Sequence, residues 1–256
     1  MKKLILLVFT LVITMSILQA QNDTVYVMHN GNVVFFSKVS QVDSVIFYKP
    51  KNLASTAIDI DGNIYNTITI GTQIWLKENL KTTKYSDGTA IPWVTDDKAW
   101  GSLSTPGYCW YNNDIVTNKD TNGAMYNWYS VNITTNGNKN VCPSGWHVPS
   151  NEDFTYLSDY LGGASISGGK LKEIGTIHWN DPNTGANNSS YFTAYPSGLR
   201  HISGSYQGMG VYGNFWTSSE DINSLGIYWY LQNNYADFFG TSTYKSLGLS
   251  VRCIKD

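Results

Sequence analysis

The sequence predicts a helix-poor α+β protein, and three observations lead to this fold class. Aromatic residues and charged residues each make up 14% of the chain, which also has 23 glycines. This composition is typical of an exported, β-rich protein with long structured loops. One stretch, residues 150–161, has the spacing of an amphipathic helix. From 191 to 253, short aromatic-rich runs alternate with Gly, Asn and Ser, as expected of strands joined by loops.

Residues 1–20 are predicted to be an export signal peptide. Lys2 and Lys3 precede an apolar run from Leu4 to Leu18, and Ala20 supplies the small residue at the cleavage point. The run is shorter than the roughly 20 residues that span a membrane, although a retained anchor is the alternative. No cysteine follows it to carry a lipid, and no later segment is apolar enough to span a membrane. We therefore expect a secreted protein, extracellular or at the cell surface.

Charge and cysteine content exclude several classes of function. Removal of the signal leaves 15 basic and 19 acidic residues, a net charge of −4, so nothing indicates a nucleic-acid partner. No Cys-x-x-Cys pattern occurs, which excludes a zinc ribbon and a thioredoxin-type site. Cys109, Cys142 and Cys253 all remain in the mature chain. In an oxidising compartment one pair is expected with one cysteine left over, and three free thiols are the alternative.

Residues 21–50 are predicted to form a small β-meander. Val25–Met28 and Val33–Phe36 flank an Asn30-Gly31 pair, and Asn-Gly between apolar runs favours a hairpin because both turn positions need a positive φ. Residues 43–47 are a candidate third strand. A unit this small is marginal alone, so we expect it to lean on the main domain or on another protein.

Residues 51–56 are predicted to be a linker and residues 57–256 the main domain. This domain opens with two strand-like segments, 65–70 and 73–76.

Residues 150–161 are the clearest predicted helix. Ser150 can cap its start, with Asp153 three residues later. Its core-facing positions follow helical spacing: Phe154, Leu157 and Leu161. Elsewhere we expect only short helical turns, one at 124–130 and at most one turn at 170–174.

Seven short sequence motifs follow one another along the main domain. They are Gln73-Ile74-Trp75-Leu76, Gly107-Tyr108-Cys109-Trp110-Tyr111, Gly123-Ala124-Met125-Tyr126-Asn127-Trp128, Cys142-Pro143-Ser144-Gly145-Trp146-His147-Val148-Pro149-Ser150, Tyr195-Pro196-Ser197-Gly198-Leu199-Arg200, Phe215-Trp216-Thr217-Ser218-Ser219 and Gly248-Leu249-Ser250-Val251-Arg252-Cys253. In these motifs and their order, the chain resembles the Fibrobacter succinogenes major paralogous domain, a secreted bacterial family. The resemblance implies a C-type-lectin-like α+β fold with short strands and long structured loops, preceded here by the small β-meander.

The resemblance also indicates which cysteines pair. Cys142 lies just before the predicted helix and Cys253 in the last strand, and lectin-like folds bring the chain ends together. We therefore predict a Cys142–Cys253 disulfide and a buried, unpaired Cys109.

Two segments are candidates for calcium or sugar binding. Asn118, Asp120 and Asn122 alternate before Gly123, as the first ligands of a calcium loop do. However, Tyr129 occupies the position where an EF-hand loop needs Glu. An ordinary Asn/Asp turn explains the segment equally well. We expect no required cofactor, with calcium as the one candidate. Sugar-binding C-type lectins use Glu-Pro-Asn and a separate Trp-Asn-Asp. Here the comparable residues of 179–183 overlap, and a surface turn is the alternative.

Aromatic residues between 179 and 239 are the main indication of a ligand site. Flat rings stack on sugar faces, although most rings in a helix-poor domain must form the core. Trp179 has polar neighbours and is predicted to be the exposed stacking ring, with Asn180 and Asp181 beside it and Arg200 and Gln232 binding hydroxyls. Trp216 is predicted to be core. The other rings of this stretch are Tyr191, Tyr228, Trp229, Tyr235 and Phe239.

The expected function is therefore a surface binding module, used in recognition or adhesion, with a glycan or protein ligand. No His-x-x-x-His or Gly-x-Ser-x-Gly pattern occurs, so we do not expect an enzyme. An assembly subunit, whose N-terminal meander pairs with a partner strand, is one alternative. A formylglycine-generating type of enzyme is another, but such enzymes use a cysteine pair near the C-terminus, where this chain has only Cys253.

Overall fold

The structure is a computed structural model that describes residues 24–29, 32–38, 40 and 56–256. The chain divides into two compact units, Met1–Leu53 and Ala54–Asp256. In the first unit, β1 (Thr24–His29) and β2 (Asn32–Lys38) pair antiparallel, so the two predicted strands are formed. The expected signal peptide and the candidate third strand lie outside the described residues.

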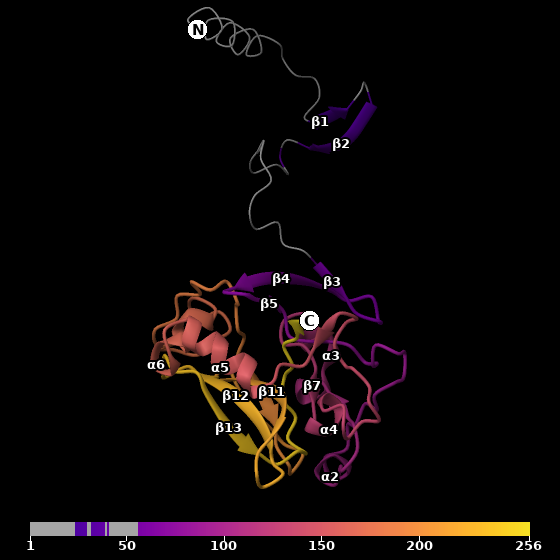
Figure 1. Cartoon of the computed structure of the whole chain (residues 1–256), viewed down its shortest axis with the longest axis vertical. Helices are drawn as coiled ribbons and strands as arrows, with labels where there is room; N and C mark the ends of the chain where they lie inside the picture. The colour runs from indigo at the N-terminus through magenta and orange to yellow at the C-terminus, as the bar shows by residue number, and fades with distance from the viewer. Residues whose placement is uncertain (1–23, 30–31, 39, 41–55) are drawn as a thin grey trace, which may run out of the picture. The chain divides into compact units, whose positions relative to one another are not determined.

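A five-stranded sheet brings the two ends of the second unit together (Figure 1). Its order is β3 (Thr56–Ile58), β4 (Ile64–Ile70), β5 (Gln73–Leu76), β14 (Ile254–Lys255) and β8 (Trp146–His147). Ile254 pairs with Trp75 on one side and with His147 on the other. The last strand therefore lies between the start of the domain and the segment that precedes its main helix.

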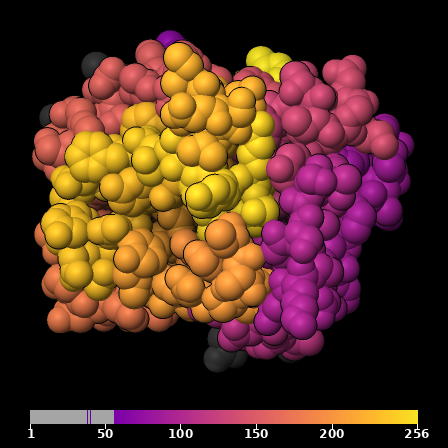
Figure 2. Space-filling model, turned by 90° about the horizontal axis from the view of Figure 1, so that it is seen from below, coloured from indigo at the N-terminus to yellow at the C-terminus, as the bar shows by residue number. Residues whose placement is uncertain are grey.

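A second sheet consists of β11 (Tyr212–Glu220), β12 (Gly226–Gln232) and β13 (Phe239–Thr243), all antiparallel. Two strand pairs complete the β structure: β6 (Tyr108–Cys109) with β7 (Met125–Tyr126), and β9 (Ser197–Arg200) with β10 (Tyr206–Met209). Seen from below in Figure 2, the C-terminal third, in orange and yellow, forms one side of the surface, beside magenta segments of the first half.

The predicted main helix is confirmed as α5 (Asn151–Tyr160). The Ser150 hydroxyl accepts a hydrogen bond from the Asp153 backbone N–H (3.1 Å), and the Asp153 carboxylate accepts one from the Ser150 N–H (2.8 Å). This is the reciprocal capping arrangement that the sequence predicts. Phe154 and Leu157 are fully buried, so the helix packs its apolar stripe on the core as expected.

A second helix, α6 (Ala164–Leu171), corrects the prediction of at most one turn at 170–174. Gly168 and Gly169 are poor helix formers, which hid this helix in the sequence. They are needed because a Cβ on Gly168 would lie 2.1 Å from the Asp237 carbonyl oxygen, and one on Gly169 would lie 2.3 Å from that of Gly185. The glycines therefore permit close backbone packing and do not end the helix.

The remaining helices are short: α2 (Asp97–Gly101), the 3₁₀ turn η2 (Tyr111–Asn113), α3 (Ile115–Asn118) and α4 (Trp128–Val131). The described part of the chain is thus helix-poor and strand-rich, compatible with the predicted α+β class. Among these residues there is no helix with the length and apolar character needed to cross a membrane.

Two features tie the core together. Trp75 of β5 stacks on Phe154 of α5 with ring centroids 5.1 Å apart, so the helix packs directly on the first sheet. Cys142 and Cys253 form the predicted disulfide, with Cα atoms 6.0 Å apart. Cys109 is free and buried, also as predicted. The bridge links the segment before α5 to the residue that precedes β14.

Candidate binding groove

Trp179, the predicted stacking ring, is fully buried, so that prediction is wrong. Its indole Nε1 donates a hydrogen bond to the Ala194 carbonyl oxygen (2.9 Å), and the Lys172 ammonium lies 5.3 Å from the ring centre. The polar neighbours misled the prediction because a loop has no fixed alternation of buried and exposed positions. Asn180 is exposed, whereas the adjacent indole turns inward.

Arg200 is also fully buried, which corrects its predicted role in binding ligand hydroxyls. Its guanidinium donates hydrogen bonds to the carbonyl oxygens of Val94, Thr95 and Gly204 and to the Asp97 carboxylate. The group also lies within 5 Å of two ring centres, at 4.6 Å from Trp100 and 4.9 Å from Tyr206. Arg200 therefore holds the α2 segment to β9 and β10.

Asn180 and Asp181 are exposed, and they belong to a turn whose backbone is hydrogen-bonded to the rest of the protein. Their carbonyl oxygens accept hydrogen bonds from the Asn233 side-chain amide (3.4 and 3.0 Å). The Asp181–Pro182 peptide is cis, and the buried Asn183 side chain donates to the carbonyl oxygens of Glu173 and Gly175. The turn shares no partner with Arg200, so the structure does not unite the predicted ligand residues in one site.

The calcium candidates are likewise engaged with the protein. The Asn118 amide donates to the Tyr111 and Asp114 carbonyl oxygens, while its oxygen accepts from Asn122 (2.7 Å). Asp120 pairs with Lys81 at 3.2 Å. Each of the three side chains thus has a partner within the protein, as the alternative of an Asn/Asp turn expects. In the part of the chain that the structure describes, no three or more His, Cys, Asp or Glu side chains group as metal ligands would.

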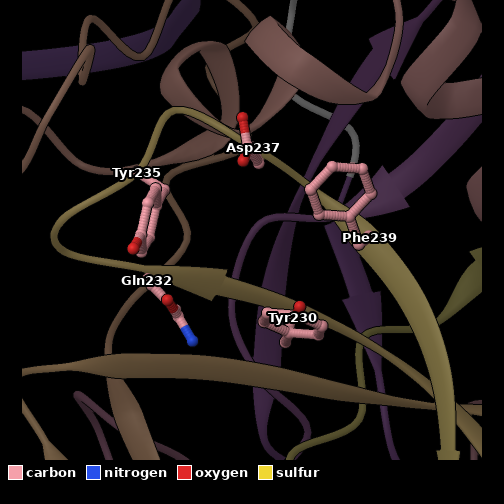
Figure 3. Close-up of a pocket in the computed structure, with 5 residues that line it drawn as sticks. All are labelled: Tyr230, Gln232, Tyr235, Asp237 and Phe239. Atoms are coloured by element: carbon pink, nitrogen blue, oxygen red, sulfur yellow. The ribbon is translucent and has the colours of Figure 1, made fainter.

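A different site is formed on the outward face of the second sheet, by two adjoining hollows. One, of about 280 Å³, is lined by Tyr230, Gln232, Tyr235, Asp237 and Phe239 (Figure 3). The other, of about 380 Å³, is lined by Leu199, Gln207, Tyr212, Asn214, Tyr228, Tyr230, Gln232 and Thr241. Because Tyr230 and Gln232 line both, the hollows form one depression, which we call the tyrosine groove.

The alternation of β12 creates this face. Trp229 and Leu231 are buried, whereas the intervening Tyr228, Tyr230 and Gln232 are only partly buried, as expected of a strand with one face on the core. Strand register places Tyr230 between Asn214 of β11 and Phe239 of β13. This antiparallel pairing assembles the groove from side chains of three successive strands.

Two glycines allow the rings to lie where they do. A Cβ on Gly240 would be 2.8 Å from the indole of the core residue Trp229, its register partner. A Cβ on Gly208, whose φ is +71°, would be 2.3 Å from the Tyr212 ring. Both positions therefore require glycine for close approach of an aromatic side chain.

Several polar groups of the groove have no partner within the protein. The side chains of Tyr212, Tyr228, Tyr230, Gln232, Tyr235 and Asp237 form no hydrogen bond with any residue that the structure describes. Burial raises the pKa of Tyr228, so its phenol remains a protonated donor at neutral pH. The groove thus combines ring faces with free donors and acceptors, an arrangement typical of ligand sites.

Lys172 supports one end of the groove from inside. It is fully buried, and its ammonium donates to the carbonyl oxygens of Thr184 (2.9 Å), Gln232 (3.0 Å) and Tyr235 (2.8 Å). Burial lowers the pKa of Lys172 to about 8. The loop after β12 is therefore held by a cation beneath it.

The sequence located the region of the groove and some of its residues. Tyr228, Gln232, Tyr235 and Phe239 were among its candidates. Tyr212, Tyr230 and Asp237 were missed. The period-two pattern Tyr228-Trp229-Tyr230-Leu231-Gln232 is the signal that indicates a shared face for Tyr230 and its neighbours.

This chain is thus a helix-poor domain with a solvent-facing aromatic groove on one sheet. It belongs to the Fibrobacter succinogenes major domain family, whose family model matches residues 68–255 and so includes every groove residue. Searches of curated proteins and of solved structures found no match.

Proposed function

We propose that this protein is an exported, C-type-lectin-like binding module of the bacterial surface that binds a saccharide chain in the tyrosine groove. The observation that carries the proposal is the row of partly exposed tyrosines and unpartnered amide and hydroxyl groups on one sheet face. Sugar rings offer apolar C–H faces that stack on aromatic rings and hydroxyls that need hydrogen-bonding partners. The groove supplies both.

The continuity of the two hollows favours an oligosaccharide over a single sugar. Tyr228 and Tyr230 both line the larger hollow, with ring centroids 5.9 Å apart, and Tyr230 also lines the smaller hollow. Gln232, shared by both hollows, offers a donor and an acceptor between them. A chain of sugars can therefore contact rings in both hollows at once.

Binding is favoured over catalysis by the state of the cysteines. Cys253 is bonded to Cys142, and Cys109 is buried. Burial raises the pKa of Cys109 to about 11, which keeps the thiol protonated and unreactive at neutral pH. The described residues thus offer no accessible cysteine pair of the kind that a formylglycine-generating enzyme needs.

A glycan array on the purified protein, with and without calcium, tests the proposal and the calcium candidate together. Hits are then titrated by calorimetry. Tyr230→Ala should weaken binding roughly tenfold or more with little change in the melting temperature. Tyr244→Ala is the matched control, because Tyr244 is 63% exposed and does not line the groove.

The proposal is overturned if no saccharide binds, or if Tyr230→Ala and Tyr244→Ala have equal affinities for the best ligand.

A further inference from the structure

The hollow at the end of the groove differs from the rest in carrying a carboxylate. Asp237 lines it and is partly exposed (Figure 3). Its carboxylate forms no hydrogen bond and no ion pair with any described residue. The hollow on the other side of Tyr230 is lined by uncharged residues alone. A negative charge without a partner in a ligand site favours a ligand that brings a positive one.

Three aromatic rings surround the same hollow. Tyr230 comes from β12, Tyr235 from the following loop and Phe239 from the start of β13 (Figure 3). Tyr235 is 56% exposed and Phe239 40%, and neither ring contacts another ring in the described residues. Both rings therefore keep surface that a ligand can contact. Open aromatic faces attract cations through the ring quadrupole.

The Lys172 ammonium near the hollow is already engaged. It donates to three carbonyl oxygens and forms no ion pair with Asp237. The two charges interact at longer range, where Asp237 favours the charged form of Lys172. Lys172 reduces the net negative charge of this end of the groove but leaves the Asp237 oxygens free for direct contact.

We propose that the hollow formed by Tyr230, Tyr235, Asp237 and Phe239 binds an ammonium group, and that the saccharide of the groove carries it as a free amine on an amino sugar. The Asp237 carboxylate accepts N–H hydrogen bonds from the amine, and the rings stabilise its charge. This inference deepens the proposed function and rests on it. It predicts a preference for de-N-acetylated over N-acetylated chains.

The test uses two oligosaccharides of equal length, one of glucosamine and one of N-acetylglucosamine, titrated at mildly acidic pH where the amines are protonated. The unmodified protein should bind the glucosamine oligomer roughly tenfold more tightly. Asp237→Asn, which keeps the shape and removes the charge, should abolish this preference by lowering affinity for the glucosamine oligomer far more than affinity for the N-acetylated oligomer. Tyr235→Ala removes a ring of the groove and should weaken binding of both oligomers, with the larger loss for the glucosamine oligomer.

Asp159→Asn is the matched control, because Asp159 is an exposed residue of α5 outside the groove. Its replacement changes the net charge of the protein by the same amount. Choline, tested alone, distinguishes a quaternary ammonium ligand from an amino sugar.

Equal binding of the two oligomers, equal effects of Asp237→Asn and Asp159→Asn, or binding of choline but not of glucosamine oligomers would each overturn the inference. Binding of other saccharides without this preference would leave the proposed function standing. Absence of any saccharide binding would overturn the proposed function first.

Discussion

The buried ammonium of Lys172 donates a hydrogen bond to the backbone carbonyl oxygen of Gln232, at 3.0 Å. The side chain of the same Gln232 lines both hollows of the tyrosine groove. Since the same ammonium also bonds Thr184 and Tyr235, one core residue determines where the end of β12 and the loop after it lie. The groove therefore depends on a charge that no ligand would touch.

Replacement of Lys172 should affect both stability and binding. Lys172→Met leaves three carbonyl oxygens without their donor and should lower the free energy of unfolding by roughly 2–4 kcal/mol. Groove affinity should fall as well, because the Gln232 and Tyr235 backbone loses its support. Chemical denaturation and calorimetry measure the two effects. Lys98→Met, at an exposed lysine of α2, is the control. Equal stability of the two variants would contradict this role.

The disulfide should contribute strongly to stability, because its cysteines are 111 positions apart in the sequence. Cys142→Ala is expected to lower the free energy of unfolding by roughly 2–5 kcal/mol, through the greater freedom of the unfolded chain. Non-reducing peptide mapping checks the pairing, and denaturant titration checks the magnitude. A variant lacking Cys109 should retain the bridge. Any bridged peptide that contains Cys109 would show that the pairing is different.

Trp179 should behave as a core residue. Trp179→Ala removes a fully buried indole and its hydrogen bond to Ala194, and should cost roughly 3–5 kcal/mol of unfolding free energy. Trp93→Ala provides the comparison, since Trp93 is 47% exposed. Thermal unfolding followed by circular dichroism measures both. The assignment would fail if Trp179→Ala melted at the temperature of the unmodified protein.

His147 should give stability a defined pH dependence. The Asp153 carboxylate lies 3.7 Å from Nε2 of His147, and the Asp256 carboxylate lies 2.6 Å from Nδ1. Both carboxylates raise the pKa of His147 above 6.5. In turn, His147 helps to lower the pKa of Asp153 from 3.8 to about 2. The raised His147 pKa stabilises the fold below 6.5, and this is lost as pH rises through the folded pKa. The lowered Asp153 pKa stabilises it above 3.8, and this is lost as pH falls toward 2.

The free energy of unfolding should therefore be greatest between these limits and decline on both sides. His147→Gln should remove the decline on the alkaline side. The acid decline should persist in part, because Ser150 still donates hydrogen bonds to Asp153. Denaturant titrations across pH measure both limbs. An unchanged alkaline decline in His147→Gln would assign it to another group.

Local sequence signals predicted what depends on neighbouring residues. The start of α5 follows from Ser150 and Asp153, which meet within one helical turn, and its buried face follows from the spacing of Phe154 and Leu157. The two apolar runs on either side of Asn30-Gly31 predicted the β1–β2 pair equally clearly. The order of the short motifs along the chain was sufficient to identify the family. The family resemblance then predicted the pairing of Cys142 with Cys253.

Tertiary structure alone decided which polar and aromatic side chains face solvent. Trp179 is buried where its indole can donate to the Ala194 carbonyl oxygen and lie beside the Lys172 ammonium. Arg200 is buried because Val94 and Thr95, more than a hundred residues earlier, supply carbonyl acceptors. The groove arises where pairing of three strands places Tyr230 between Asn214 and Phe239. The partners of Arg200 lie far outside any local window, and those of Trp179 and Tyr230 are nearer but are brought together by loops and strand pairing. The free energy of burying a ring or a charge depends on the partners that the fold brings to it.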